Sequence, residues 1–344
     1  MSTLNAETIK QFAYSRGLDL CGIANIERFR DAPIRMHPAS ILPEAKSVIV
    51  VGKRIIRGGW RGIEEGTYWP SYTYFDYHGL LNTLFIQRPL YDLASFIEDD
   101  GWEAVPLYSG VPETQPDIEP LRPGGIASDV QLAIRIAATA AGLGEMGWAK
   151  VFLTKKFGPR QRLHAIITDL ALEPDPLVPP GTICDRCMSC VRGCPGAIPH
   201  IKEGRTVEVT IEDYTYQWAD IDFGKCALGY HGGDSRMSPF IHKSFPGWNI
   251  DVSEQEFSEE AAYKFCWTLS NQKWRETKEF PSGYIIEGHA KLTEWGVGGS
   301  YGVGGSRGCM RSCFDHLEER GRIEQTFEDG SFIRRPRWLL PARV

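Results

Sequence analysis

The first half of the sequence has almost no cysteine: of the nine cysteines in the 344-residue chain, only Cys21 precedes position 184. The chain also lacks an excess of basic residues, because 38 Lys and Arg stand against 44 Asp and Glu, a net charge of −6. This balance argues against a general nucleic-acid-binding protein, which would carry a basic footprint. The 42% hydrophobic and 24% charged residues exclude the disordered and fibrous classes and fit a globular protein of one large or two modest domains.

Long hydrophobic runs are missing as well. Stretches such as residues 47–52 are far shorter than a membrane span. The first residues, MSTLNAETIKQFAYSRG, show neither a basic segment followed by an apolar one nor a twin-arginine run. We therefore expect a cytoplasmic protein with no membrane partner, in which clustered cysteines are metal ligands or redox groups rather than disulfides.

Helix and strand patterns alternate along the first half of the chain and predict an α+β or α/β domain. Helices are expected at residues 5–16, where Asn5 can act as the cap, and at residues 78–99 and 128–141. Strands are expected at residues 18–26, 47–52, 102–108 and 164–170. Residues 58–78 are rich in Gly, Trp and Tyr and predict a loop that carries aromatic side chains.

Four prolines in residues 173–183 mark a domain boundary. We expect a first domain at residues 1–178, a second at residues 179–320 and a C-terminal extension at residues 321–344.

The strongest motif opens the cysteine-rich part of the chain. Its residues, Cys184, Cys187, Cys190, Cys194 and Pro195, spell C-x2-C-x2-C-x3-C-P. An iron–sulfur cluster needs several thiolates around one inorganic core, and this spacing wraps a loop around it. Zinc sites come instead as two separated C-x2-C pairs, so the motif favours iron–sulfur clusters over zinc.

A second, dispersed set consists of Cys226, Cys266, Cys309 and Cys313. It lacks the regular spacing, because Ser306 stands three residues before Cys309. In two-cluster ferredoxins the fourth cysteine of the motif binds the other cluster. This crossing predicts one [4Fe–4S] cluster at Cys184, Cys187, Cys190 and Cys313, and a second at Cys194, Cys226, Cys266 and Cys309. The alternative is a single cluster, with Cys226 and Cys266 as buried apolar thiols.

A glycine-rich segment, AGLGEMG, lies upstream of the cysteines. Gly142, Gly144 and Gly147 match G-x-G-x-x-G, but they follow a predicted helix rather than a strand, which argues against a dinucleotide loop. Glycines here allow the chain to pass close to a flat cofactor, or they end the helix.

The segments AGLGEMG, FGPRQRL and TDLALEPD, in this order before the cysteine motif, resemble the cobalamin-dependent iron–sulfur reductases, which comprise reductive dehalogenases and epoxyqueuosine reductases. The upstream segments ILPEAKSVIVVG and DDGWEAVPLY resemble the same family. The resemblance covers about residues 10–200 and weakens beyond them. It implies a nitroreductase-like domain that holds base-off cobalamin, followed by a ferredoxin-like domain with two [4Fe–4S] clusters.

The resemblance also implies cofactor contacts at Gly142, Leu143, Gly144 and Gly147, with Thr168 and Asp169 nearby. The dehalogenases commonly carry a Tyr proton donor in a G-Y-x-A pattern, but this chain has Trp102 at that place. The remaining candidates for the catalytic groups are Asp129, Arg162 and Tyr77.

Each of these three residues also has a structural interpretation. Asp129 lies within about one residue of the Asp that epoxyqueuosine reductases place at a helix start, where a carboxylate is common for the helix dipole alone. Arg162 can stabilise an anion or pair on the surface. Tyr77 belongs to a group of tyrosines that can serve in packing.

The expected function is a reductase that passes single electrons through the clusters to cobalamin and on to a small organic substrate, whether or not a halogen is removed. The alternatives are an epoxyqueuosine reductase-type tRNA-modification enzyme and a cluster-only electron-transfer protein. We expect an external low-potential electron donor of the ferredoxin or flavodoxin type. Nucleic acid is not expected as a partner, and the nitroreductase-like domain allows a homodimer.

Overall fold

The computed structural model describes residues 4–65, 71–76, 80–107, 130–230, 233–234, 236–237, 250–254, 256, 258–262, 264 and 307–327. In these parts of the chain no helix is both long enough and apolar enough to cross a membrane. Helices and strands both contribute, which agrees with the predicted α+β class.

A four-stranded sheet forms the centre of the first half. In spatial order its strands are β1 (Leu20–Asn25), β2 (Ser47–Arg54), β6 (Gln161–Thr168) and β3 (Ala104–Leu107), and all neighbours are antiparallel. The middle strands β2 and β6 are buried on both faces. The continuous apolar run of residues 47–52 follows from this double burial.

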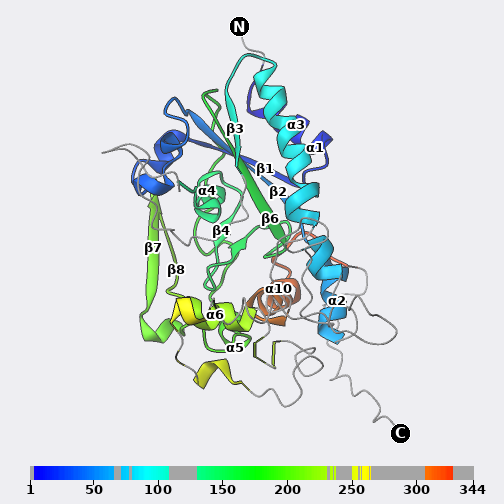
Figure 1. Cartoon of the computed structure of the whole chain (residues 1–344), viewed down its shortest axis with the longest axis vertical. Coiled ribbons are helices and arrows are strands. Elements are labelled where there is room, and N and C mark those ends of the chain that lie inside the picture. Colours follow the sequence, from blue (N-terminus) through cyan, green and yellow to red (C-terminus); the bar gives the residue numbers. More distant parts are fainter. Residues whose placement is uncertain are drawn as a thin grey trace, which may run out of the picture.

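Helices cover both faces of the sheet. On one face lie α1 (Ala6–Ser15) and α3 (Gln87–Glu98), whose Phe12 and Phe96 rings stack with centroids 4.1 Å apart (Figure 1). On the other face lies α4 (Ile134–Ala140). Alternate residues of β2 and β6 therefore enter two separate cores, one under α1 and α3 and one under α4.

The predicted start of the first helix is confirmed by hydrogen bonds at its cap. Asn5 accepts a hydrogen bond from the N–H of Thr8 (3.0 Å), and the Thr8 hydroxyl accepts one from the N–H of Asn5 (2.9 Å), which confirms the start of α1. Two other helices are shorter than predicted. A π-helical turn, η5 (Leu81–Phe85), precedes α3, and residues 130–133 before α4 are not helical.

The predicted aromatic loop at residues 58–78 is wrong in part. Residues Arg57–Glu65 form helix α2, and Ser71–Asp76 form a π-helical turn, η4. Trp60 is wholly buried and meets the ring of Phe314 edge-on, with centroids 5.5 Å apart. This packing outweighs the poor helix propensity of the glycines in α2, which the sequence pattern alone could not reveal.

Two small hairpins and several short helices complete the described chain. The hairpins pair β4 (Glu145–Met146) with β5 (Phe152–Leu153), and β7 (Thr206–Ile211) with β8 (Tyr214–Ala219). The helices of the cysteine-rich part are α5 (Ser189–Arg192), α6 (Phe223–Tyr230) and α10 (Cys309–Glu319). Short 3-10 turns are η1 (Ile26–Phe29), η2 (Ile34–Met36), η3 (Pro38–Ser40), η6 (Ile201–Glu203) and η7 (Val252–Glu254).

Helix α10 packs into the core of the first half. Phe314 and Leu317 belong to the same apolar cluster as the residues under α1 and α3. The buried Arg160 guanidinium lies 4.6 Å from the Phe314 ring centroid and donates a hydrogen bond to the carbonyl of Ile55 (2.8 Å). This core therefore contains residues from both sides of the proline-rich segment at residues 173–183. The division into domains at residue 178 stays a prediction.

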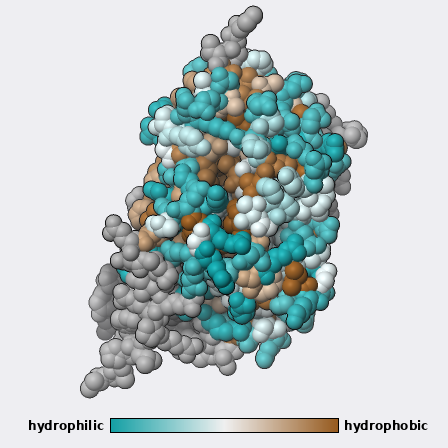
Figure 2. Space-filling model, turned by 180° about the vertical axis from the view of Figure 1, so that it is seen from behind, coloured by the Kyte–Doolittle hydropathy of each residue, from teal (hydrophilic) through white to brown (hydrophobic). Residues whose placement is uncertain are grey.

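The rear face of the molecule is mostly polar. Apolar residues show through in its middle, with hydrophilic residues around them (Figure 2). This distribution fits a chain whose apolar side chains are concentrated in the cores beside the sheet.

Burial of His164 on β6 predicts a pH effect on stability. Burial lowers the pKa of His164 to about 4, below its ordinary value of 6.5. As the pH falls below 6.5, the unfolded chain gains a proton that the folded chain does not, so stability falls. Between pH 7.5 and 5.5 the wild type should lose about 1 kcal/mol more than His164→Gln, as measured by urea unfolding. The neighbouring Ile166→Val should keep the wild-type slope, and equal slopes for wild type and His164→Gln would contradict the assignment.

Candidate metal centre

Four predicted thiols line one cavity. Cys184 and Cys187 come from the segment that leads into α5, Cys190 comes from α5 itself, and Cys313 comes from α10. Burial raises the pKa of Cys313 well above its ordinary value, and the neighbouring Cys184, Cys190 and Cys187 raise it further. We call these four residues the first thiol set. The structure brings together the set that the crossing of the motif predicts.

A second thiol set contains Cys194, Cys226 and Cys309. Burial raises the pKa of Cys309 well above its ordinary value, and the adjacent Cys194 and Cys226 raise it further. Cys226 is exposed, yet desolvation by the surrounding protein raises its pKa to about 12. Cys266, the predicted fourth member, lies outside the described residues.

The two thiol sets are neighbours on α10. Cys309 and Cys313 are four residues apart and so lie on one side of the helix, one turn from each other. The pKa of Cys309 is raised in part by Cys190, a member of the first set. Gly193 allows this close approach, because a Cβ there would clash with the Ser312 side chain of α10.

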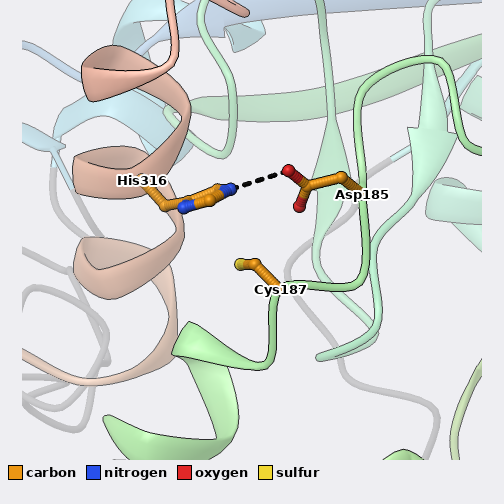
Figure 3. A group of neighbouring side chains, drawn as sticks. All are labelled: Asp185, Cys187 and His316. Atoms are coloured by element: carbon orange, nitrogen blue, oxygen red, sulfur yellow. Dashed lines mark hydrogen bonds and ion pairs between the residues drawn. The ribbon is translucent and has the colours of Figure 1, made fainter.

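Figure 3 shows Asp185, Cys187 and His316 pointing toward one another between the cysteine segment and α10. His316 Nε2 lies 2.8 Å from Asp185 Oδ2. Burial alone would raise the pKa of Asp185, but the hydrogen bond and charge of His316, with the charge of Arg322, lower it overall. This pair ties α10 to the segment that carries Cys184 and Cys187. Sequence reasoning missed it, although His316 follows Cys313 by one helical turn.

Glu145 and Trp148 hold the same segment from the other side. The buried Glu145 carboxylate accepts hydrogen bonds from the N–H groups of Gly181 (2.7 Å), Ile183 and Cys184 (2.9 Å). Burial raises the pKa of Cys184, while hydrogen bonds from the backbone of Arg186 and Trp148 lower it. Glu145 lies in AGLGEMG and Trp148 follows it directly. Sequence reasoning had considered only the glycines of this segment.

The three glycines of that segment lie against the chain itself. Gly142 follows α4 with a φ of +68°, and a Cβ on it would clash with the Pro176 carbonyl. A Cβ on Gly144 would clash with the Leu153 carbonyl, and one on Gly147 would lie 2.8 Å from the Leu153 side chain. Internal packing therefore explains the glycines, and their contact with cobalamin stays a prediction.

The other residues predicted near the cofactor also have internal roles. Leu143 packs against the core under α4. The Thr168 hydroxyl accepts a hydrogen bond from the N–H of Leu170 (3.1 Å), and Asp169 accepts one from the N–H of Glu103 (2.9 Å). The last two contacts shape the end of β6 beside β3.

Of the three predicted catalytic residues, only Arg162 lies in the described chain, so the structure does not test their convergence. Arg162 and His164 alternate with Leu163 on β6, so both point toward the α1 and α3 face. Leu143 packs on the opposite face. Asp129 and Tyr77 lie outside the described residues.

No family model matches the chain. The curated relatives are tetrachloroethene reductive dehalogenases. That of Desulfitobacterium hafniense is 32% identical over 165 residues, covering 43% of this chain and 30% of that protein. That of Dehalobacter restrictus is 31% identical over 175 residues, covering 46% and 31%. These relatives are enzymes and confirm the resemblance that the motifs indicate, but the match spans less than a third of their length.

Solved structures of both enzyme types are similar to the chain. A catabolic reductive dehalogenase has a TM-score of 0.44 at 19% identity, covering 65% of this chain and 29% of that one. An epoxyqueuosine reductase with a tRNA stem loop has a TM-score of 0.46 at 14% identity, covering 92% and 82%. The tRNA stem loop belongs to that protein. For this chain, no observation supports the expectation that nucleic acid is not a partner.

The close packing at Gly144 gives a direct test of the segment's structure. Gly144→Ala should lower the free energy of unfolding by about 1–3 kcal/mol, because the added methyl group forces β4 and β5 apart. The control is Gly58→Ala in α2, where a Cβ meets nothing within 4 Å and should stabilise the helix by up to about 1 kcal/mol. Anaerobic urea unfolding measures both, and a neutral Gly144→Ala would contradict the packing.

Proposed function

We propose that this chain is an iron–sulfur oxidoreductase of the reductive-dehalogenase type, which reduces a small organic substrate. The observation that carries the proposal is the convergence of Cys184, Cys187, Cys190 and Cys313 on one cavity. The similarity to reductive dehalogenases supports the reaction class. The proposal includes substrates that lose a halogen on reduction and substrates that do not.

The first thiol set fits a [4Fe–4S] cluster by its donor chemistry. All four cysteines line one cavity, and burial disfavours the thiolate forms of Cys184, Cys190 and Cys313 unless a cation compensates the charge. Such a cluster supplies single electrons at low potential when it is bound. The second thiol set fits a second cluster, for which Cys266 is the proposed fourth ligand.

The protein around these sulfurs excludes water and donates hydrogen bonds. Met188, Cys190, Trp148 and Ile198 belong to one buried apolar cluster beside the cysteines. The N–H of Ala197 donates to Cys194 Sγ at 3.3 Å. Hydrogen bonds of this kind withdraw charge from sulfur, and with burial they tune the reduction potential of a cluster.

Cobalamin belongs to the proposal through the sequence resemblance. The described residues Gly142, Gly144 and Gly147 fit their own chain rather than a cofactor cradle, so no contact with cobalamin is derived from them. We also propose a cytoplasmic location, a low-potential donor protein of the ferredoxin or flavodoxin type, and a homodimer compatible with the nitroreductase-like domain.

Iron analysis tests the two-cluster assignment. Protein purified without oxygen should contain about eight iron atoms and about eight sulfides per chain. Cys313→Ser or Cys226→Ser should each lower the iron content to about four, because each removes a ligand of one cluster only. Cys21→Ser is the matched control, since Cys21 lies in β1 and the charged groups that act on its thiol, Lys10 and Asp175, include no cysteine. About four irons in the wild type, with no effect of Cys226→Ser on the iron content, would contradict the second cluster and indicate a single one.

Cobalamin binding is tested separately from the clusters. Protein with full iron content should retain about one cobalt per chain after incubation with cobalamin and removal of the free cofactor. The absorption spectrum of the bound corrinoid should differ from that of free cobalamin, because the base-off form has lost its nucleotide ligand. Full iron content without retained cobalt would contradict the cobalamin part of the proposal and leave a cluster-only electron carrier.

A further inference from the structure

We propose that Glu145 is a positioning residue for Cys184, and that its buried negative charge keeps the reduction potential of the first cluster low. The inference rests on the proposed iron–sulfur function. It assigns to the glycine-rich segment a role toward the cluster, in addition to its packing.

Glu145 holds the chain immediately before the first cysteine. Oε2 accepts from the N–H of Gly181, and Oε1 accepts from the N–H groups of Ile183 and Cys184. The residue is 2% exposed. Three backbone donors that converge on one buried carboxylate fix the course of this loop, because moving the loop would leave those N–H groups and the carboxylate unpaired.

The chain around Glu145 is itself held firmly. Its strand pairs Glu145 with Leu153 and Met146 with Phe152, and Gly144 lies against the Leu153 carbonyl. Three residues later, the Trp148 indole donates to the Pro199 carbonyl at 3.0 Å. The segment thus contacts the chain both before Cys184 and after Cys194. A rigid support of this kind can set the position of a ligand sulfur.

The chemistry of the three contacts requires a carboxylate. A carboxylate offers two acceptor oxygens and no donor, which matches three N–H groups. A glutamine would direct its own NH2 group at one of these donors. In the described part of the chain the hydrogen-bond partners of Glu145 are backbone amides, and no cation there forms an ion pair with it.

The charge of Glu145 acts on the first thiol set. Glu145 Oε1 lies 2.9 Å from the backbone nitrogen of Cys184, so the carboxylate disfavours further negative charge at the adjacent sulfur. Reduction adds one electron to a cluster, so the same repulsion opposes reduction. In a buried site with few compensating charges, this effect lowers the reduction potential.

The test compares Glu145→Gln with Glu212→Gln, an exposed glutamate of the β7–β8 hairpin that pairs with Arg28 at 2.7 Å. Anaerobic redox titration followed by electron paramagnetic resonance measures the potential of each cluster. Glu145→Gln should shift the first cluster to a higher potential and leave the second unchanged, and Glu212→Gln should change neither. Unchanged potentials and iron content in Glu145→Gln would overturn the proposal.

A second variant keeps the proposal testable if Glu145→Gln does not fold. Glu145→Asp keeps the charge but shortens the side chain, so it should lose iron at the first thiol set while the clusters that do form keep the wild-type potential. Full iron content and an unchanged potential would show that Glu145 does not position Cys184. Wild-type protein without any cluster signal would instead refute the proposed function, so the two failures are distinguishable.

Discussion

The burial of many thiols around one region is the constraint on which the site depends. Burial raises the pKa of Cys190 and Cys226 to about 12, and that of Cys309 and Cys313 well above the ordinary value. At neutral pH such thiols are protonated and uncharged, so they can pack as small apolar side chains. Binding a cluster would require their thiolate forms, and the positive charge of iron would compensate the cost of burying those charges.

The surrounding fold holds α10 and the segment with Cys184, Cys187 and Cys190 in fixed positions relative to each other. Helix α10 carries one thiol of each set and is held by Phe314 and Leu317 in the core under α1 and α3. The cysteine segment is held by His316 on one side and by Glu145 on the other. The thiols are therefore placed by the sheet and helix core as well as by the loop that contains them, an arrangement that would suit the proposed transfer of electrons with little rearrangement.

Sequence reasoning was most successful where the signal is local. The spacing of Cys184, Cys187 and Cys190 predicted thiols that line one cavity, Asn5 as the cap predicted the start of α1, and the apolar run of residues 47–52 predicted β2. The place of Cys313 beside these thiols was predicted from the crossing seen in two-cluster ferredoxins, not from a local signal. The contacts of Glu145 with Cys184, and of Asp185 with His316, join residues far apart in the sequence, and a single sequence carries no sign of such pairs. The glycines were ambiguous for a physical reason, because the absence of a side chain serves a close backbone contact as well as a cofactor. Helix α2 was missed because burial of Trp60 overrides local propensity.

The electron paramagnetic resonance spectrum of the fully reduced protein, with its spins counted, tests directly whether two adjacent clusters are present. If Cys309 and Cys313, one helical turn apart, are ligands of different clusters as proposed, the reduced protein should show about two spins per chain and a spectrum broadened by magnetic coupling between neighbouring clusters. A single, sharp and uncoupled signal of about one spin would contradict the central claim that the two thiol sets hold two adjacent [4Fe–4S] clusters.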